Sequence, residues 1–308
     1  MSRKILIVDD LHPAFKLKAI ELGYEVDDRP LITRAETIAV IGTYDGIAVR
    51  TKFQIDREFF DAATNLKFVA RAGAGLDNID VAHAEERGVI LINAPEGNCD
   101  AVGEHAIGML LSLANHFRKA DQQVRSGIWD REDNRGWELK GKTVGIIGYG
   151  FMGQSFAKKL SGFGVQVIAY DKYKTGFSDQ YVREVSMEEI VKFSDVLSLH
   201  IPLTSETRQL VTEEYLLHFK KPIFFISTAR GEITSTRAVL DAIINGKIVG
   251  AGLDVLEVEK FPKLAEQEWY TDLVNSGKVI LTPHVAGWTF DSYRKISEVL
   301  AEKLSAIA

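Results

Sequence analysis

Short runs of β-branched and aliphatic residues recur along the chain, and stretches with apolar residues at helical spacing separate them. In the first hundred residues the runs predict strands at residues 4–8, 47–50, 66–70 and 89–92. The stretches between the runs predict helices at residues 13–22, 56–63 and 81–86. This alternation predicts a parallel sheet, because parallel strands need crossover connections and are buried on both faces.

The pattern changes at residues 101–129, which contain no proline and keep apolar residues at helical spacing. These residues predict one long helix or two helices in succession. A second alternating series follows, with strands predicted at residues 143–147, 165–170, 196–200, 223–227, 249–253 and 279–281. Ser186 and Glu189 form a capping-box pattern at the start of one intervening helix. Two α/β domains with doubly wound parallel sheets are therefore predicted.

The chain is predicted to return to its first domain at the end. Residues after Phe290 keep apolar positions at helical spacing, and packing against the first domain is the most economical use of such a helix. The predicted first domain comprises residues 1–97 and 285–308, and the second comprises residues 98–284. These boundaries depend on where the pattern restarts, since the composition does not shift there.

Composition and charge exclude several classes of protein. The 308 residues are 46% hydrophobic and 26% charged, which is ordinary for a globular chain. The net charge of -6 disfavours a nucleic-acid partner. The apolar start ends at Asp9 and is too short for a signal peptide or a membrane span, and the single cysteine, Cys99, cannot form an intramolecular disulfide. We therefore expect a cytoplasmic protein with no nucleic-acid partner, membrane partner or metal site.

A glycine-rich loop stands near the start of the second series. Gly148, Gly150 and Gly153 form a G-x-G-x-x-G pattern that follows a predicted strand and opens a predicted helix. The pattern alone is weak, but in this setting each glycine has a physical task. Gly148 permits the tight turn, Gly150 lets the backbone approach a pyrophosphate, and Gly153 lets helix and strand pack closely. The helix N-terminus then binds the pyrophosphate of a dinucleotide.

An acidic residue follows the next strand. Asp171 comes 18 residues after Gly153, close to the spacing typical of dinucleotide-binding domains. Its carboxylate can accept hydrogen bonds from the adenosine ribose hydroxyls and would repel a 2′-phosphate. The sequence therefore predicts NAD rather than NADP as the cofactor, although Lys172 and Lys174 lie close enough to weaken this preference.

A second glycine loop, from Gly73 to Asn78, follows the predicted strand 66–70. Asn78 stands where a third glycine would be needed, so this loop does not predict a second dinucleotide site. The backbone N–H groups of Ala74 and Gly75 could instead hold a small carboxylate, because consecutive backbone donors form an anion nest.

Hydride transfer with a nicotinamide requires a proton donor or acceptor, for which histidine has a suitable pKa. Of the seven histidines, those at positions 83, 105, 116 and 218 lie in helical stretches and are expected to be structural. His200 and His284 end predicted strands, at the sheet edge where open α/β sheets bind ligands. We favour His284 because it comes where the chain returns to the first domain, and His200 is the alternative.

Other charged residues also follow strands of the second series. Arg230 comes after the strand 223–227, where its guanidinium could bind a carboxylate through two hydrogen bonds. Glu257 and Glu259 follow the strand that ends at Leu253. From the residues alone, neither glutamate can be chosen as the partner of a histidine.

Together these motifs resemble the D-isomer-specific 2-hydroxyacid dehydrogenases, especially their phosphoglycerate dehydrogenase and hydroxypyruvate reductase branch. The resemblance covers nearly the whole chain and rests on segments that begin at Arg71, Glu138, Ser198, Ser227, Gly252 and Thr282. It implies a Rossmann NAD-binding domain inserted into a flavodoxin-like substrate domain. It also implies a homodimeric, NAD-dependent oxidoreductase that interconverts a small, anionic D-2-hydroxyacid and its 2-ketoacid.

The resemblance assigns roles to individual residues. His284 is implied to be the general acid in ketoacid reduction, Glu259 its carboxylate partner, and Arg230 the group that binds the substrate carboxylate and polarises the C2 carbonyl. Ala74 and Gly75 would hold the same carboxylate through their backbone groups. Apart from the three loop glycines, the implied cofactor contacts are Phe151, Met152, Asp171, His200, Pro202, Thr228, Ala229, Asp254 and Gly287.

The substrate remains open at this stage. After Glu259 the family's usual proline is replaced by Lys260, followed by Phe261 and Pro262, so the loop over the substrate differs from that of other members. Arg50 matches a position that can meet the distal phosphate in phosphoglycerate enzymes, and an ordinary strand-end arginine is an equal alternative. The first candidate pair is 3-phosphoglycerate and 3-phosphohydroxypyruvate, and hydroxypyruvate or glyoxylate is the second.

Two further alternatives come from other activities. An NAD(H)-sensing, corepressor-like scaffold is possible because some relatives of this fold act in that way. Formate dehydrogenase is a weaker alternative, since that enzyme pairs its histidine with glutamine and this chain offers Glu259.

Overall fold

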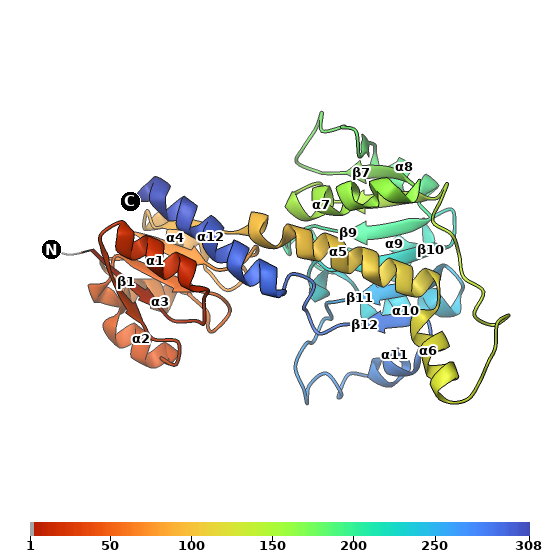
Figure 1. The fold of residues 1–308 in the computed structure, drawn as a ribbon, viewed down its shortest axis with the longest axis horizontal. Helices are drawn as coiled ribbons and strands as arrows, with labels where there is room; N and C mark the ends of the chain where they lie inside the picture. Colours follow the sequence, from red (N-terminus) through yellow and green to blue (C-terminus); the bar gives the residue numbers. More distant parts are fainter. Residues whose placement is uncertain (1–2) are drawn as a thin grey trace. The chain divides into compact units, whose positions relative to one another are not determined.

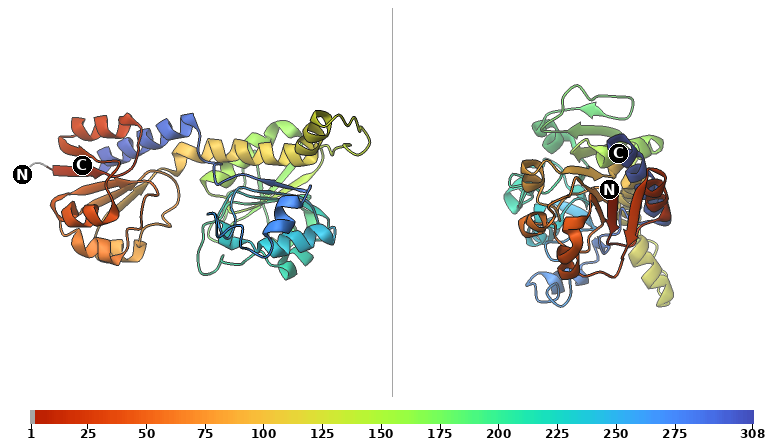
Figure 2. Two further views of the ribbon diagram at one scale, coloured as in Figure 1. Left: turned by 90° about the horizontal axis from the view of Figure 1, so that it is seen from below. Right: turned by 90° about the vertical axis from the view of Figure 1, so that its left-hand side faces the viewer.

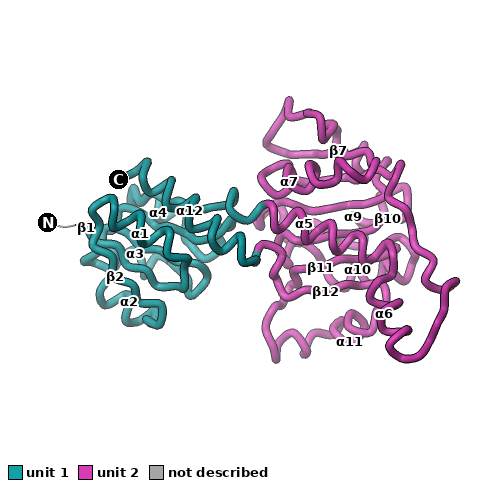
Figure 3. Tube along the Cα trace, in the orientation of Figure 1, with its two compact units in different colours: residues 1–99, 288–308 teal, residues 100–287 magenta. Residues whose placement is uncertain are grey.

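The computed structural model describes residues 3–308 and divides them into two compact units (Figures 1 and 3). Unit 1 contains the described residues up to Cys99 together with Trp288–Ala308, and unit 2 contains Asp100–Gly287. Unit 2 is therefore an insertion into unit 1. Within residues 3–308, no helix is long and apolar enough to cross a membrane.

Unit 1 is built around a five-stranded parallel sheet in the order β2-β1-β3-β4-β5. Its strands are β1 (Arg3–Ile7), β2 (Tyr24–Asp28), β3 (Gly46–Val49), β4 (Phe68–Arg71) and β5 (Ile90–Asn93). Its helices are α1 (Pro13–Glu21), α2 (Arg34–Val40), α3 (Arg57–Ala62), α4 (Val81–Glu86) and α12 (Phe290–Ile307). The strand order is that of flavodoxin-like folds. Buried aliphatic and aromatic side chains form a core on each face of the sheet.

The last helix belongs to unit 1. Helix α12 packs against α1, β4 and β5, and its buried side chains include Ile296, Leu300 and Leu304. Ile296 comes so close to Gly97 that a Cβ at this glycine would lie 2.6 Å from the Ile296 backbone. The chain end thereby packs on one face of a sheet whose five strands all lie within the first hundred residues.

Two elements of unit 1 are absent from the sequence prediction. Strand β2 reads Tyr-Glu-Val-Asp-Asp and lies at the sheet edge, where charged side chains can reach water, so it lacks the apolar run that marked the other strands. Helix α2 is short and begins at a capping box in which Thr33 and Glu36 exchange hydrogen bonds. The alternating pattern continues through these residues, but without the continuous hydrophobicity of a buried strand.

Unit 2 contains a seven-stranded parallel sheet in the order β12-β11-β10-β9-β6-β7-β8. Its strands are β6 (Thr143–Ile147), β7 (Gln166–Tyr170), β8 (Arg183–Glu184), β9 (Val196–Leu199), β10 (Ile223–Ser227), β11 (Ile248–Leu253) and β12 (Val279–Leu281). The chain starts at the centre of the sheet and winds outward in both directions, which is the Rossmann order. The predicted fold class, with two doubly wound parallel sheets, is confirmed.

Helices cover both faces of each sheet (Figure 2). In unit 2 these are α6 (Phe117–Arg125), α7 (Phe151–Leu160), α8 (Met187–Phe193), α9 (Glu213–Leu217), α10 (Thr236–Ile244) and α11 (Tyr270–Asn275), together with most of α5 (Pro95–Ala114). Strands β6, β9 and β10 are buried along their whole length, because two core clusters pack against the sheet.

The helical stretch predicted at residues 101–129 forms two helices, α5 and α6. Helix α5 begins at Pro95, six residues earlier than the pattern indicated, because proline is well tolerated in the first turn of a helix. The helices are separated at His116, whose backbone adopts the left-handed conformation with φ 53°. That conformation interrupts the α-helix between Ala114 and Phe117.

Candidate active site

The glycine loop between β6 and α7 has the geometry that its sequence predicts. Gly148 has a φ of +92°, and a Cβ there would lie 2.5 Å from the carbonyl oxygen of His200. A Cβ at Gly153 would lie 2.2 Å from the carbonyl oxygen of Gly148. A Cβ placed at Gly150 would have no described atom within 4 Å apart from those of its own chain neighbours. Two of the glycines therefore permit close packing of the chain on itself, and the third leaves open space beside the loop.

This open space suits a dinucleotide phosphate. Gly150 caps α7 in an extended conformation without a side-chain hydrogen bond, so the first-turn N–H groups have no side-chain acceptor at that position. The hydroxyl of Thr228, beyond the end of β10, is buried without a hydrogen-bond partner among residues 3–308. The open space beside Gly150 and the N-terminus of α7 lie after the carboxyl end of β6, and the Thr228 hydroxyl lies after the carboxyl end of β10 in the same sheet.

Asp171 follows β7, as expected for the ribose-binding acid. Its Oδ2 accepts a hydrogen bond from Tyr149 N at 2.8 Å, and its Oδ1 accepts from the backbone N–H groups of Tyr173 and Lys174. A carboxylate has further lone pairs for a ribose hydroxyl. Lys172 forms an ion pair with Glu206 at 2.6 Å, which reduces its capacity to attract a 2′-phosphate.

His284 and Glu259 form an ion pair. Glu259 follows β11 and His284 follows β12, on the other side of the central strand β6 from Asp171, which follows β7. Nδ1 of His284 lies 2.9 Å from Oε2 of Glu259, and both side chains are substantially exposed. The Glu259 hydrogen bond raises the pKa of His284, and the opposing effects of partial burial and Arg230 are smaller. Because Nδ1 is engaged by Glu259, Nε2 is the ring nitrogen left to exchange a proton with a ligand.

Asp254 holds the loop that carries His284. This buried carboxylate accepts hydrogen bonds from the Thr282 hydroxyl, Val285 N and Ala286 N, and the Asp254 carbonyl accepts from His284 N at 2.8 Å. His284 itself has a φ of 55°, an uncommon left-handed conformation for a residue with a side chain. The hydrogen bonds to Asp254 thus offset local backbone strain and fix the imidazole.

His105, which the sequence suggested was structural, belongs to the support of this loop. Its Nε2 lies 3.0 Å from Oγ1 of Thr282 and 3.7 Å from Oδ1 of Asp254. The Thr282 hydroxyl donates its only proton to Asp254, so His105 Nε2 must be the donor in its contact with Thr282. Sequence spacing could not reveal this contact, because it joins α5 to a loop 177 positions later.

The structure shows which of the two glutamates, Glu257 or Glu259, contacts a histidine. Glu259 pairs with His284, whereas Glu257 accepts hydrogen bonds from Thr236 N at 2.8 Å and Gln209 Nε2 at 3.0 Å. Arg230 lies near enough to oppose protonation of His284 electrostatically, and its Nη1 donates to the Ala229 carbonyl. His284, Glu259 and Arg230 are therefore brought together at one edge of the unit 2 sheet.

His200, the alternative proton donor, does not reach this group. Its ring is enclosed beside Phe156, with Nε2 at 2.9 Å from the Ser198 hydroxyl, and burial lowers its pKa to about 4. A histidine that is neutral at ordinary pH cannot serve as the proton reservoir. Its backbone carbonyl, rather than its ring, contacts the glycine loop at Gly148.

The other predicted cofactor contacts are distributed around the same sheet edge. Phe151 is half exposed and Met152 partly exposed at the start of α7, Ala229 is buried beside Arg230, and Pro202 is exposed after β9. Gly287 is the last residue of unit 2. These positions come from the carboxyl ends of β6, β9, β10 and β12.

Unit 1 contains a second group of polar and aromatic side chains. The Arg50 guanidinium, after β3, stacks on the Trp288 ring with Cζ 4.2 Å from the ring centroid. The Arg50 Nη1 atom is buried without a hydrogen-bond partner among the described residues. Ala74 and Gly75 follow β4 in the same unit, and Asn93 donates to the Ala74 carbonyl. Their placement matches the ligand-binding edge of an open parallel sheet.

Comparison with known proteins decides the family. The sequence model of the D-isomer specific 2-hydroxyacid dehydrogenase NAD-binding domain matches residues 107–286. A hydroxypyruvate reductase from Thermotoga maritima is 36% identical over 89% of this chain and 88% of its own length. The chain belongs to the D-isomer-specific 2-hydroxyacid dehydrogenases. It is thus an NAD-dependent oxidoreductase, and the expected family, enzyme class and cofactor are confirmed.

Other relatives of this dehydrogenase carry different substrate names. A D-3-phosphoglycerate dehydrogenase from Archaeoglobus fulgidus is 35% identical over 93% of this chain, which spans only 54% of that relative's length. The solved structure of a glyoxylate reductase from Paecilomyes thermophila superimposes with a TM-score of 0.87 at 26% identity, covering 99% of this chain and 95% of that one. The family is thereby shown, but these relatives do not decide among the three substrates.

Proposed function

We propose that this dehydrogenase interconverts 3-phosphoglycerate and 3-phosphohydroxypyruvate, and that His284 transfers the proton. The observation that carries the proton role is the 2.9 Å contact between His284 Nδ1 and Glu259. This contact favours the imidazolium form, which is the form required to protonate the C2 oxygen when a ketoacid is reduced. In the oxidative direction, neutral His284 would accept the same proton.

The remaining parts of the chain would bind and orient the substrate. NAD(H), when bound, supplies or accepts the hydride. Arg230 would bind the substrate carboxylate and polarise the C2 carbonyl, for which a planar guanidinium is well suited. The Ala74 and Gly75 amides offer further donors for a carboxylate. Asp254 and His105 would act through the loop, by keeping the His284 imidazole in place.

Arg50 supports a substrate with a second anionic group. Its guanidinium is oriented by stacking on Trp288, and one of its nitrogens has no acceptor within residues 3–308. Trp288 is in turn held edge-on by Tyr293, whose hydroxyl donates to Asp10. A distal phosphate would provide the missing acceptor and neutralise the charge, which a substrate as small as glyoxylate would not do.

Hydroxypyruvate or glyoxylate reduction is the second candidate. It is favoured by relatives that match this chain over most of their length, such as the hydroxypyruvate reductase described above, which is covered over 88% of its length. The two candidates differ in one measurable quantity, the ratio of kcat/KM for 3-phosphohydroxypyruvate to that for hydroxypyruvate with NADH. A ratio well above one supports the phosphorylated substrate, and a ratio below one supports the reductase. No NADH oxidation with any ketoacid would instead favour the NAD(H)-sensing scaffold.

We also propose that the dehydrogenase is a homodimer that associates through the region of α6. Helix α6 buries no side chain within the chain, and apolar residues are exposed on it and in the loop that follows, including Phe117, Val124, Ile128 and Trp129. Exposed apolar clusters of this kind favour a protein interface. Sedimentation equilibrium should give twice the chain mass, and replacing Trp129 and Ile128 with serine should shift it towards the monomer.

A further inference from the structure

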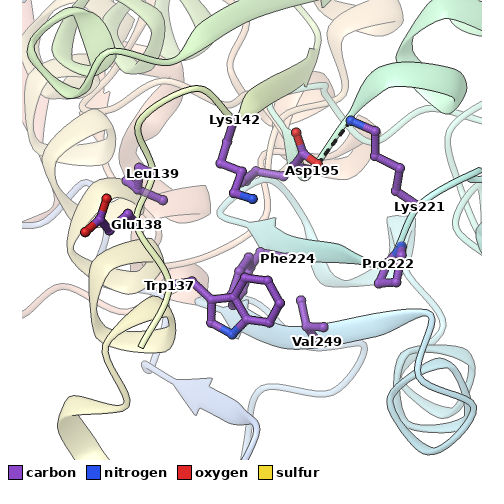
Figure 4. Close-up of a pocket in the computed structure, with 10 residues that line it drawn as sticks. Trp137, Glu138, Leu139, Lys142, Asp195, Lys221, Pro222, Phe224 and Val249 are labelled. Atoms are coloured by element: carbon purple, nitrogen blue, oxygen red, sulfur yellow. Dashed lines mark hydrogen bonds and ion pairs between the residues drawn. The ribbon is translucent and has the colours of Figure 1, made fainter. Parts of the chain in front are cut away.

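A cavity lies at the amino-terminal ends of the strands of the unit 2 sheet, whereas the glycine loop lies at their carboxyl ends (Figure 4). It measures about 240 Å³, and its lining comes from the segment before β6 and from the amino-terminal ends of β9, β10 and β11. Strand β6 has five residues, so at ~3.3 Å per residue the cavity is about 16 Å from the glycine loop. It is therefore separate from the cofactor and proton-transfer residues.

The cavity has apolar walls. Its apolar lining residues are Trp137, Leu139, Pro222, Phe224 and Val249. The Trp137 ring is half exposed, while its backbone N–H donates to the Ala114 carbonyl at the end of α5. This hydrogen bond holds the Trp137 backbone, and the half-exposed indole offers an aromatic surface on which a flat apolar group can stack.

One wall is polar but already satisfied by its own contacts. Asp195 accepts from Thr143 N at 2.8 Å and from Lys221 Nζ at 3.1 Å, and Lys221 also donates to the Phe193 carbonyl. These bonds connect the segments around β6, β9 and β10. The wall is therefore preorganised, and neither Asp195 nor Lys221 requires a ligand.

Lys142 differs from these residues. Figure 4 shows its side chain directed into the space between Trp137 and Asp195. Within residues 3–308, its ammonium group makes no ion pair, and its Nζ lies over the Trp137 ring, 5.7 Å from the centroid. Glu138 also lines the cavity, but its carboxylate is turned away from Lys142 in this view. The cavity therefore combines an aromatic wall with one unpaired positive charge.

We propose that this cavity binds a small carboxylate with a single flat ring or a branched apolar body. The apolar part would stack between Trp137 and Phe224, and the carboxylate would pair with Lys142. The volume is below the ~300 Å³ at which pockets begin to hold drug-sized ligands, which limits the occupant to a small molecule. Because the cavity and the glycine loop lie at opposite sheet edges, the ligand and NADH would bind together.

The test uses 3-(4-fluorophenyl)propanoate as the probe, observed by 19F NMR with the full-length enzyme saturated with NADH. We expect a Kd of about 1 mM, as ligand efficiency allows for so small a molecule. Lys142→Met should weaken binding about tenfold, because it removes the charge and keeps the apolar stem. Lys140→Met, two positions earlier and exposed to solvent, is the matched control and should bind as wild type does.

Two further measurements make the result specific. The neutral amide of the same probe should bind the wild type about as weakly as the acid binds the Lys142→Met variant. NADH affinity should be equal in wild type and both variants, which shows that they are folded. Absence of probe binding, equal binding to the Lys142→Met variant, or displacement of the probe by NADH would each overturn the proposal.

Discussion

A single pair of side chains, His284 and Glu259, controls the proposed proton transfer. Glu259 raises the pKa of His284, so the imidazolium persists to higher pH than an isolated histidine would allow. Ketoacid reduction uses the protonated form and should decline as pH rises through this raised pKa. Oxidation uses the neutral form and should increase over the same range.

Glu259→Gln should shift both pH profiles to lower pH, because it removes the charge that raises the His284 pKa while keeping a similar shape. The reductive kcat at neutral pH should also fall, by about 10²-fold. The measurement is kcat/KM against pH in both directions. Glu257→Gln is the control, since Glu257 contacts Thr236 and Gln209 instead of His284. Unshifted profiles in the Glu259→Gln variant would refute the pairing.

Arg50 is the residue on which substrate choice is proposed to depend. Arg50→Met should raise the KM for 3-phosphohydroxypyruvate about tenfold, since it removes a charged hydrogen bond to the phosphate. The KM for glyoxylate should remain within about twofold of wild type by the same reasoning. Trp288→Phe retains an aromatic surface under the guanidinium and should have a smaller effect. Equal KM changes for both ketoacids would indicate that Arg50 only supports the fold.

In the β6–α7 loop, one glycine is needed for the fold and another for the proposed cofactor binding. Gly153→Ala would place a Cβ 2.2 Å from the Gly148 carbonyl oxygen, so we expect a lower Tm. The Cβ of Gly150→Ala would meet no described atom within 4 Å beyond its chain neighbours, so the Tm of the apoenzyme should stay near wild type. It should weaken NADH binding about tenfold or more, because the methyl group occupies the space for the pyrophosphate.

Thermal unfolding without cofactor and fluorescence titration with NADH distinguish these two effects. We expect Gly153→Ala to lose mainly stability and Gly150→Ala to lose mainly NADH affinity. Wild-type NADH affinity in the Gly150→Ala variant would contradict the assignment of the pyrophosphate to this loop.

Sequence patterns predicted the buried elements better than the exposed ones. Fully buried strands such as β6 and β10 appear as continuous apolar runs, because both faces are covered. The edge strand β2 contains three acidic residues among its five, so it has no continuous apolar run and the sequence pattern does not predict it. The sequence could propose the glycine loop and His284 as site residues because the loop lies directly between a strand and a helix and His284 follows a strand end. Their roles in binding and catalysis stay predictions. The role of His105 depends on a tertiary contact with Thr282, which no local pattern records.

At the scale of the whole molecule, a net charge of -6 must be reconciled with an anionic substrate. The overall field repels such a molecule, so binding depends on local donors. The chain offers Arg230 in unit 2, and Arg50 and the Ala74–Gly75 amides in unit 1. The two sheets are completed separately, and each presents its candidate ligand-binding groups at the carboxyl ends of its own strands.

The chain is an NAD-dependent 2-hydroxyacid dehydrogenase, and His284 is its proposed proton donor. The most direct test is the rate of NADH oxidation with 3-phosphohydroxypyruvate and hydroxypyruvate in wild type and in His284→Ala. We expect rapid oxidation by wild type and a turnover lower by about 10²–10⁴-fold in the variant, with NADH still bound. Near wild-type turnover in the His284→Ala variant would contradict the role of His284 as proton donor.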